Sequence, residues 1–157
     1  MEDIQAMDDR SIEMERFTSA IDLIRKKFPE LQIEIQDEEP HIHAAASIDK
    51  QPGVDFYISI NLQNRDELHL LAEALWSTWF PIGEERVFEK FIDAVLGLLS
   101  GEYRIVEHRI WGSLIKAQLQ KPCGHEWQTI YTSRPVPSLA FLPLARSRRY
   151  IQNRAAT

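Results

Sequence analysis

The residues best suited to chemistry lie in two short stretches, "HIH" at 41–43 and "PCGHEW" at 122–127. Cys123 is the only cysteine of the chain, and His125 follows it across a glycine. A cysteine nucleophile needs an imidazole within about 3 Å, and that partner usually comes from a distant part of the chain. A proline followed by a glycine is typical of a turn between strands. We therefore favour a hairpin loop over a thiol–imidazole site.

Metal binding is the alternative chemistry for these stretches. On an extended strand, His41 and His43 lie on the same side with Cα atoms about 6.5–7 Å apart, which lets two imidazoles share one ion. Cys123 and His125 would complete a four-ligand set. Structural zinc sites usually show spacings such as C-x₂-C, whereas each pair here is separated by one residue. We predict no metal and no other cofactor. Under the metal-binding alternative, the candidate ligands are these four residues.

Other common catalytic signatures are absent from the sequence. The six glycines match neither G-x-x-x-x-G-K nor G-x-G-x-x-G, and no G-x-S-x-G occurs. The 24 acidic residues are too many for one pair to stand out as general acid and base. These observations favour a protein that is not an enzyme.

Tryptophans and arginines are the remaining candidates for a recognition surface. Tryptophan is enriched among residues that dominate binding energies, although a domain of this size also needs large side chains in its core. We expect at least three of the four tryptophans to be core residues. The candidate surface residues are Trp76, Trp79, Trp111, Arg146, Arg148 and Arg149.

The net charge of −6 is unevenly distributed. Residues 1–40 hold twelve acids and five bases, residues 41–133 twelve acids and eight bases, and residues 134–157 five arginines and no acid. An acidic body favours a basic partner and disfavours nucleic acid, although "RSRRYIQNR" could contact phosphates and stack Tyr150 on a base. One cysteine, no signal peptide and no long apolar run indicate a cytoplasmic protein that does not cross a membrane.

Hydrophobic periodicity indicates the secondary structure. Apolar spacings of three and four predict a helix over 11–28, capped by Asp9 or Ser11, and a wider core helix over 84–100 that ends at Gly101. Gly97 inside the second helix marks a close contact with the sheet. Alternation predicts strands over 31–36, 41–48, 54–62, 103–110, 113–120 and 127–133. Residues 66–80 fit either a helix or one long strand, and we favour the strand because it completes a meander.

This order of elements predicts a single α+β domain over 1–133, mostly antiparallel sheet in two meanders, with an N-terminal helix and a central amphipathic helix packed on it. Residues 134–157 form a Pro-rich and then basic extension, which we expect to wrap onto the domain because exposed apolar residues favour aggregation.

The architecture alone resembles that of small bacterial binding modules, including secretion chaperones and toxin-neutralising immunity proteins. We therefore expect a non-enzymatic protein-binding module whose partner is another, basic protein or a second copy of the chain. The alternative is a small-molecule-binding protein or enzyme with an aromatic-lined pocket between the sheet and the central helix.

Overall fold

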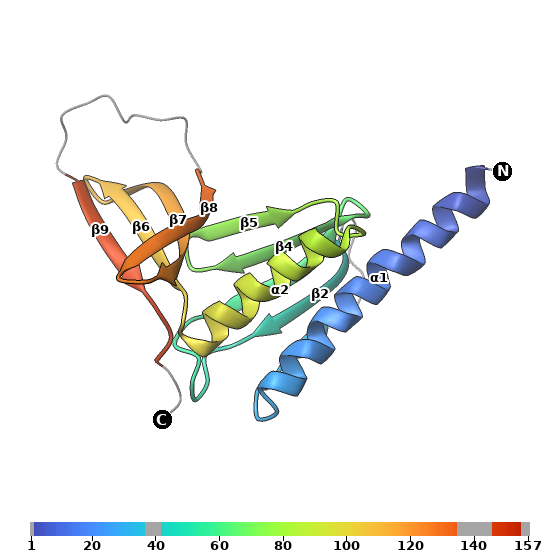
Figure 1. The fold of residues 1–157 in the computed structure, drawn as a ribbon, viewed down its shortest axis with the longest axis horizontal. Helices are drawn as coiled ribbons and strands as arrows, with labels where there is room; N and C mark the ends of the chain where they lie inside the picture. The colour runs from blue at the N-terminus through green and yellow to red at the C-terminus, as the bar shows by residue number, and fades with distance from the viewer. Residues whose placement is uncertain (1, 37–41, 135–145, 155–157) are drawn as a thin grey trace.

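A computed structural model of the chain describes residues 2–36, 42–134 and 146–154. The fold is α+β with two helices and two antiparallel sheets, as the sequence predicts (Figure 1). The first sheet has the order β1-β2-β3-β4-β5 and the second the order β8-β7-β6-β9. The elements are α1 (Glu2–Lys27), β1 (Glu34–Gln36), β2 (Ile42–Ile48), β3 (Ile58–Gln63), β4 (Glu67–Ala72), β5 (Leu75–Trp79), α2 (Glu85–Ser100), β6 (Arg104–Ile110), β7 (Ser113–Cys123), β8 (Glu126–Ser133) and β9 (Arg146–Ile151).

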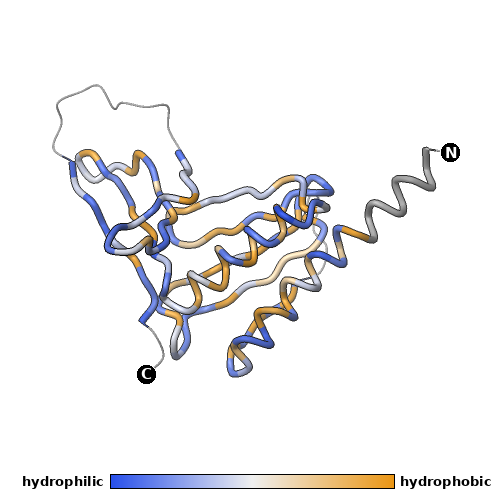
Figure 2. The backbone as a smooth tube through the Cα atoms, viewed as in Figure 1, coloured by the Kyte–Doolittle hydropathy of each residue, from blue (hydrophilic) through white to orange (hydrophobic). Residues whose placement is uncertain are grey.

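Both helices cover one face of the first sheet (Figure 1). The alternation of β3 and β4 sends isoleucines and leucines to this face, where they pack against the apolar stripe of α2. Figure 2 shows hydrophobic residues recurring turn by turn along α2, which is the pattern of a core helix. The core therefore lies between the first sheet and the helices, and its largest fully buried side chains include Ile58, Ile60, Leu68, Leu70, Phe91 and Leu98.

Helix α2 matches its predicted bounds, and Gly101 adopts the left-handed conformation expected of its C-terminal cap, with φ of 76°. Helix α1 ends before Pro29 as predicted but begins at Glu2, so the predicted caps at Asp9 and Ser11 are wrong. The prediction overlooked that acidic residues are themselves favourable near a helix N-terminus, so the helix extends N-terminal to Asp9 and Ser11.

The strand prediction for residues 66–80 is correct in type but wrong in number. The segment forms a hairpin of β4 and β5, and the chain turns at Glu73, whose φ is 50°. Glutamate is an unusual residue for a left-handed conformation. The sequence at this turn therefore contains none of the residues, Gly, Asn or Pro, from which a turn is usually predicted. Strand β1 is also shorter than predicted, because only Glu34–Gln36 pairs with β2 and all three residues are exposed.

The second sheet gains a strand that the sequence did not predict. Arg146–Ile151 forms β9, which pairs with β6 in a regular antiparallel register. Ile151 faces Ile105, and both join the core. The described part of the C-terminal segment is therefore an edge strand of the domain's second sheet.

Gly97 lies against the ring of Tyr103, the residue immediately before β6. A Cβ atom at position 97 would lie 2.5 Å from two ring carbons of Tyr103. The close contact predicted for this glycine therefore exists, and its partner is the chain that leads into the second sheet.

Candidate functional site

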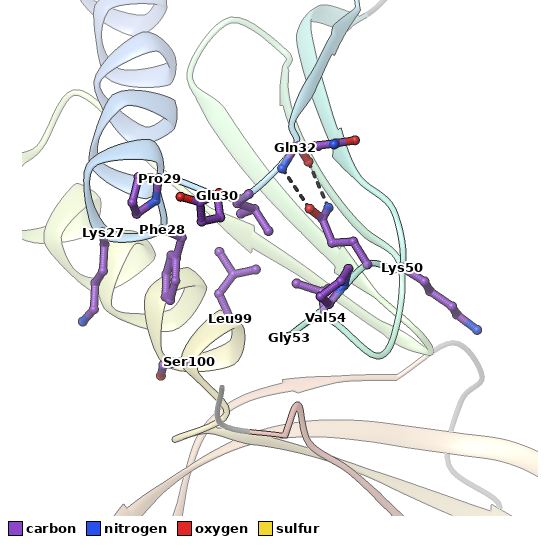
Figure 3. A pocket seen from close by; sticks show the side chains of 13 residues that line it. Lys27, Phe28, Pro29, Glu30, Gln32, Lys50, Gly53, Val54, Leu99 and Ser100 are labelled. Carbon is purple, nitrogen blue, oxygen red and sulfur yellow. Dashed lines mark hydrogen bonds between the residues drawn. The ribbon is translucent and has the colours of Figure 1, made fainter. Parts of the chain in front are cut away.

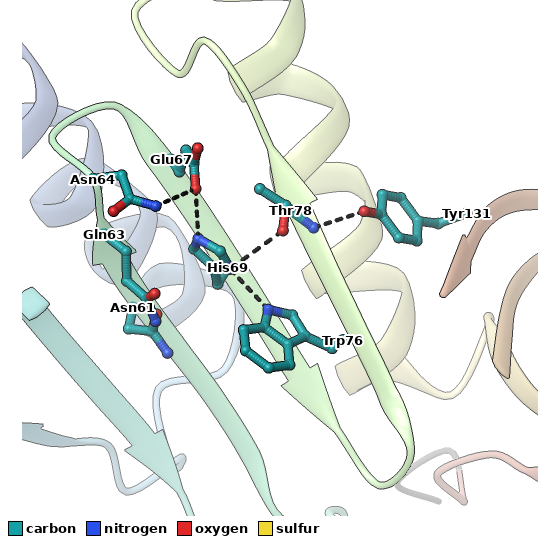
Figure 4. A network of polar contacts seen from close by, with 8 residues as sticks. All are labelled: Asn61, Gln63, Asn64, Glu67, His69, Trp76, Thr78 and Tyr131. Carbon is teal, nitrogen blue, oxygen red and sulfur yellow. Dashed lines mark hydrogen bonds and ion pairs between the residues drawn. The ribbon is translucent and has the colours of Figure 1, made fainter. Parts of the chain in front are cut away.

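The face of the first sheet opposite the helices is mostly polar. The strand register places Ala45, Asn61, His69 and Thr78 in one row across β2 to β5. Figure 4 shows the side chains of Asn61, His69 and Thr78 in front of the sheet, with the helices behind it. None of the residues in β1 to β5 is lysine or arginine, whereas Glu34 and Glu67 are acidic. The strands of this polar face therefore contribute carboxylates and no lysine or arginine.

His69 is the centre of a hydrogen-bond network on the polar face. It is 5% exposed, and its Nδ1 accepts a hydrogen bond of 2.8 Å from the indole Nε1 of Trp76. Because an indole N–H can only donate, Nδ1 must be unprotonated, and the proton lies on Nε2. Nε2 then donates to Glu67 Oε2 at 3.1 Å, and Asn64 Nδ2 donates to the same oxygen at 2.9 Å. The network thus fixes both the tautomer and the orientation of His69 (Figure 4).

Trp76 presents its ring to solvent from this network. Its side chain remains 55% exposed although its polar atom is engaged, and its ring is tilted against the His69 ring with centroids 5.9 Å apart. The result is an aromatic surface held in one position, because the hydrogen bond to His69 removes rotational freedom from the indole.

The second sheet closes the free edge of β5 beside Trp76. The backbone N–H of Thr78 donates to the hydroxyl of Tyr131 at 2.9 Å, and that of Trp76 donates to Ser133 Oγ at 3.4 Å. Both acceptors lie on β8. These side chains satisfy backbone donors that would otherwise form an open sheet edge, and they hold the strand that carries Trp76.

The chemistry of the network favours positioning over catalysis. A general base needs a free acceptor atom near its substrate, and in His69 that atom, Nδ1, is bonded to Trp76 and lies 3.3 Å from Thr78 Oγ1. Among the described residues, no buried side-chain polar atom lacks a hydrogen-bond partner. The polar face therefore holds Trp76 in place and has no buried group waiting for a ligand.

The structure separates most of the candidate metal ligands. Cys123 and His125 lie exposed at the β7–β8 turn of the second sheet, which confirms the hairpin predicted for "PCGHEW". His43 is partly buried on β2 of the first sheet, and His41 lies outside the described residues. Among the described residues, no group of three or more His, Cys, Asp or Glu side chains could hold a metal ion.

The tryptophans are not core residues, so that expectation is wrong. Trp111 is 74% exposed at the β6–β7 turn, and Trp76 is exposed as described above. Trp79 is partly buried against Phe91 and Tyr131, and Trp127 is partly buried on β8. Isoleucine, leucine and phenylalanine fill the core instead, which leaves the tryptophan rings at its margin and on the surface.

The three candidate arginines lie on β9 and are exposed. Arg149 reaches two carboxylates, with its Nη1 3.4 Å from Glu73 and 3.6 Å from Glu107. Glu107 is 1% exposed and also pairs with Arg109 at 2.9 Å. Because Glu73 lies in the β4–β5 turn and Glu107 on β6, Arg149 links the two sheets electrostatically. Arg146 and Arg148 extend from the opposite face of β9.

A groove of about 870 Å³ lies where α1 and α2 end (Figure 3). Phe28 is the only aromatic among its lining residues, and Gln51 closes one wall through hydrogen bonds to the backbone N–H and C=O of Gln32 at 2.8 and 3.0 Å. The sequence predicts a pocket lined by aromatic residues between the sheet and the central helix. This groove is lined mainly by lysines, glutamines, prolines and aliphatic residues.

No protein family, curated protein or solved structure matches the chain. None of the helices in the described part of the chain is long and apolar enough to cross a membrane.

Proposed function

We propose that the protein is a non-enzymatic, cytoplasmic protein-binding module that recognises its partner through the polar face of the first sheet. The observation that carries the proposal is the half-exposed Trp76 ring, whose N–H is anchored on the buried His69. Aromatic side chains dominate the energetics of interfaces, and a ring already held in its bound position loses little entropy on binding.

The charge of the polar face defines the partner. Its strands contribute carboxylates and no lysine or arginine, so a basic or neutral polar surface is complementary to it. These properties suit a chaperone-like or immunity-like role, in which a small acidic protein covers a basic partner. A second copy of the chain is the alternative partner.

The test is a comparison of two exposed tryptophans. The partner is first captured by cross-linking in the source cells, then purified and titrated by isothermal calorimetry. Trp76→Ala is expected to weaken binding by about thirtyfold, the effect typical of a central interface residue. Trp76→Phe keeps an aromatic ring but loses the N–H donor to His69, so an intermediate loss is expected.

Trp111→Ala is the matched control, since Trp111 is the more exposed residue and lies at the β6–β7 turn of the other sheet. It should change the affinity by less than about twofold, as most interface-distant residues do. Loss of binding in Trp111→Ala with normal binding in Trp76→Ala would place the recognition surface elsewhere. Light scattering of the free protein reports whether a second copy is the partner.

Small-molecule binding in the groove is the second candidate function. The groove volume of about 870 Å³ falls within the range typical of ligand sites. A ligand that binds the native state raises the melting temperature. A thermal-shift screen with a metabolite library tests this function, and Leu31→Trp, which would fill the groove, should abolish any shift. A screen without a specific shift counts against it.

A further inference from the structure

The second sheet has an outer face that the function proposed above does not use. Ile105, Ala117, Leu119 and Ile151 point into the core, so the residues that alternate with them point away from it. This outer face, here called the basic face, carries Arg104, Lys116, Trp127, Arg146, Arg148 and Tyr150. Figure 2 shows β9, its edge strand, as mostly hydrophilic.

Positive charge is concentrated on the basic face. Four of its residues are lysine or arginine, and none of the described strand residues on it is acidic. The buried Glu107 belongs to the inner face, where arginines neutralise it. The overall charge of −6 therefore hides a local positive surface, because the acidic excess lies in other parts of the chain.

A row of stacked side chains crosses the basic face. The guanidinium of Arg104 lies between the Trp127 ring, 4.0 Å from its centroid, and the Tyr150 ring, 4.7 Å from its centroid. Arg104 Nε donates to Gln120 Oε1 at 3.0 Å, and Gln120 Nε2 donates to Thr129 Oγ1 at 3.2 Å. The row thus joins all four strands, and the Nη atoms of Arg104 donate to no described residue.

This geometry prepares Arg104 to bind an anion. Stacking on two rings holds the planar guanidinium in one orientation, which leaves its outer N–H donors ready for an oxyanion at little cost in entropy. The Tyr150 side chain is 54% exposed, so part of its ring is accessible to solvent.

The electrostatics at the other end of the face agree with a positive surface. Partial burial lowers the pKa of His108, a hydrogen bond with Gln118 opposes this shift, and the charges of Lys116 and Arg148 lower the pKa further. His108 therefore lies in the positive field of its neighbours on β7 and β9.

We propose that the basic face binds single-stranded nucleic acid. Phosphates contact Arg104 Nη, Lys116 and Arg148, and an unpaired base stacks on the exposed Tyr150 ring. An acidic peptide would satisfy the charges but would leave the aromatic row without a role, whereas aromatics interleaved with basic residues are the usual platform for unpaired bases. A duplex would hide its bases from Tyr150. The expectation that nucleic acid is not a partner was based on the overall negative charge. The fold gathers basic residues on one face of the second sheet, so the overall charge does not describe that face.

Fluorescence anisotropy with a labelled oligodeoxythymidine of about 12 nucleotides tests the proposal, because such lengths span a typical site. Binding at physiological ionic strength is expected to be stronger than for a duplex or a polyglutamate peptide of equal charge. Arg148→Glu should weaken binding about tenfold and reduce its dependence on salt, as loss of a phosphate contact does. Tyr150→Leu should weaken it about tenfold through lost stacking.

Arg86→Glu is the matched control, since it makes the same change of charge at an exposed position of α2. It should weaken binding by less than about twofold, because α2 begins at its end away from the second sheet (Figure 1) and salt screens charges on distant surfaces. Lys116→Glu supplies a second charge reversal on the basic face if Arg148→Glu does not fold by circular dichroism. Equal losses in Arg86→Glu and Arg148→Glu, stronger binding of polyglutamate, or no binding of the oligonucleotide would each overturn the proposal.

Discussion

Because of the contact between Gly97 and Tyr103, we expect Gly97→Ala to lower the free energy of unfolding, whereas a glycine-to-alanine change inside a helix usually raises it. Replacing a glycine inside a helix by alanine normally stabilises a protein by about 0.8–1.0 kcal/mol, because the unfolded chain loses freedom. Gly97 lies inside α2, so helix propensity alone favours Gly97→Ala. However, the new methyl group would lie 2.5 Å from ring atoms of Tyr103, so the ring must move.

Two hydrogen bonds of Tyr103 leave its ring little freedom to move. The backbone N–H of Tyr103 donates to the carbonyl of Gly97 at 2.9 Å, and its hydroxyl donates to Asp93 Oδ2 at 2.7 Å. Burial, followed by this hydrogen bond, raises the pKa of Tyr103 far above its usual range, so the hydroxyl remains a donor. Overpacking costs about 1–3 kcal/mol, and disrupting the hydrogen bond to Asp93 costs about 1.5–3 kcal/mol more. After subtraction of the propensity gain, Gly97→Ala should destabilise the fold by about 1.5–5 kcal/mol.

Urea denaturation of a double-mutant cycle measures this effect. Tyr103→Ala removes the obstacle, so Gly97→Ala made in that background should stabilise the protein by up to about 1 kcal/mol. The same substitution therefore changes sign between the two backgrounds. If Gly97→Ala stabilises the wild-type chain as much as the Tyr103→Ala variant, the ring contact does not explain the glycine.

Three further predictions concern the second sheet and its contact with the first. Tyr131→Phe removes the acceptor of the Thr78 N–H and should cost about 1 kcal/mol in urea denaturation, and an unchanged midpoint would contradict this. The pKa of His108 is lowered in the folded state, so folding opposes protonation of this side chain. The stability contributed by neutral His108 is therefore complete above pH 6.5 and falls as the pH drops below that value. In thermal melts across this pH range, His108→Gln should flatten the dependence of the melting temperature on pH. Arg109→Ala leaves the buried Glu107 with a weaker partner and should cost about 3 kcal/mol in unfolding free energy, whereas a loss below about 1 kcal/mol would show that Arg149 is sufficient.

Local sequence patterns account for most of the fold. Helix α2 was predictable because its wide apolar stripe and Gly101 act within one segment, and the strands of both meanders were predictable from alternation. The turn at Glu73 was not, because a left-handed glutamate carries no turn signal. Strand β9 was missed because its pairing with β6 depends on residues distant in sequence, and an arginine-rich strand shows no clear alternation of apolar side chains.

The candidate site was predictable only in part. Trp76 was singled out by residue type, but His69 and Glu67 were not, although a histidine between leucines in "ELHLLA" is the one polar residue in the middle of that strand. Its role depends on the register that sets His69 beside Thr78 and close to Trp76. The role of Tyr131 as acceptor for the Thr78 N–H depends on the packing of β8 against β5, which no local sequence pattern predicts.

The two proposed surfaces follow from the separation of charge between the sheets. The strands of the first sheet contain no lysine or arginine, while those of the second contain seven. Charges on surfaces farther apart than the Debye length, about 8 Å at physiological ionic strength, act almost independently, so each face can attract a partner of opposite sign. A substitution at Trp76 should then leave oligonucleotide binding intact, and one at Tyr150 should leave protein binding intact. Loss of both activities in either variant would mean that one surface serves both partners, and the separation of charge would not be the basis of recognition.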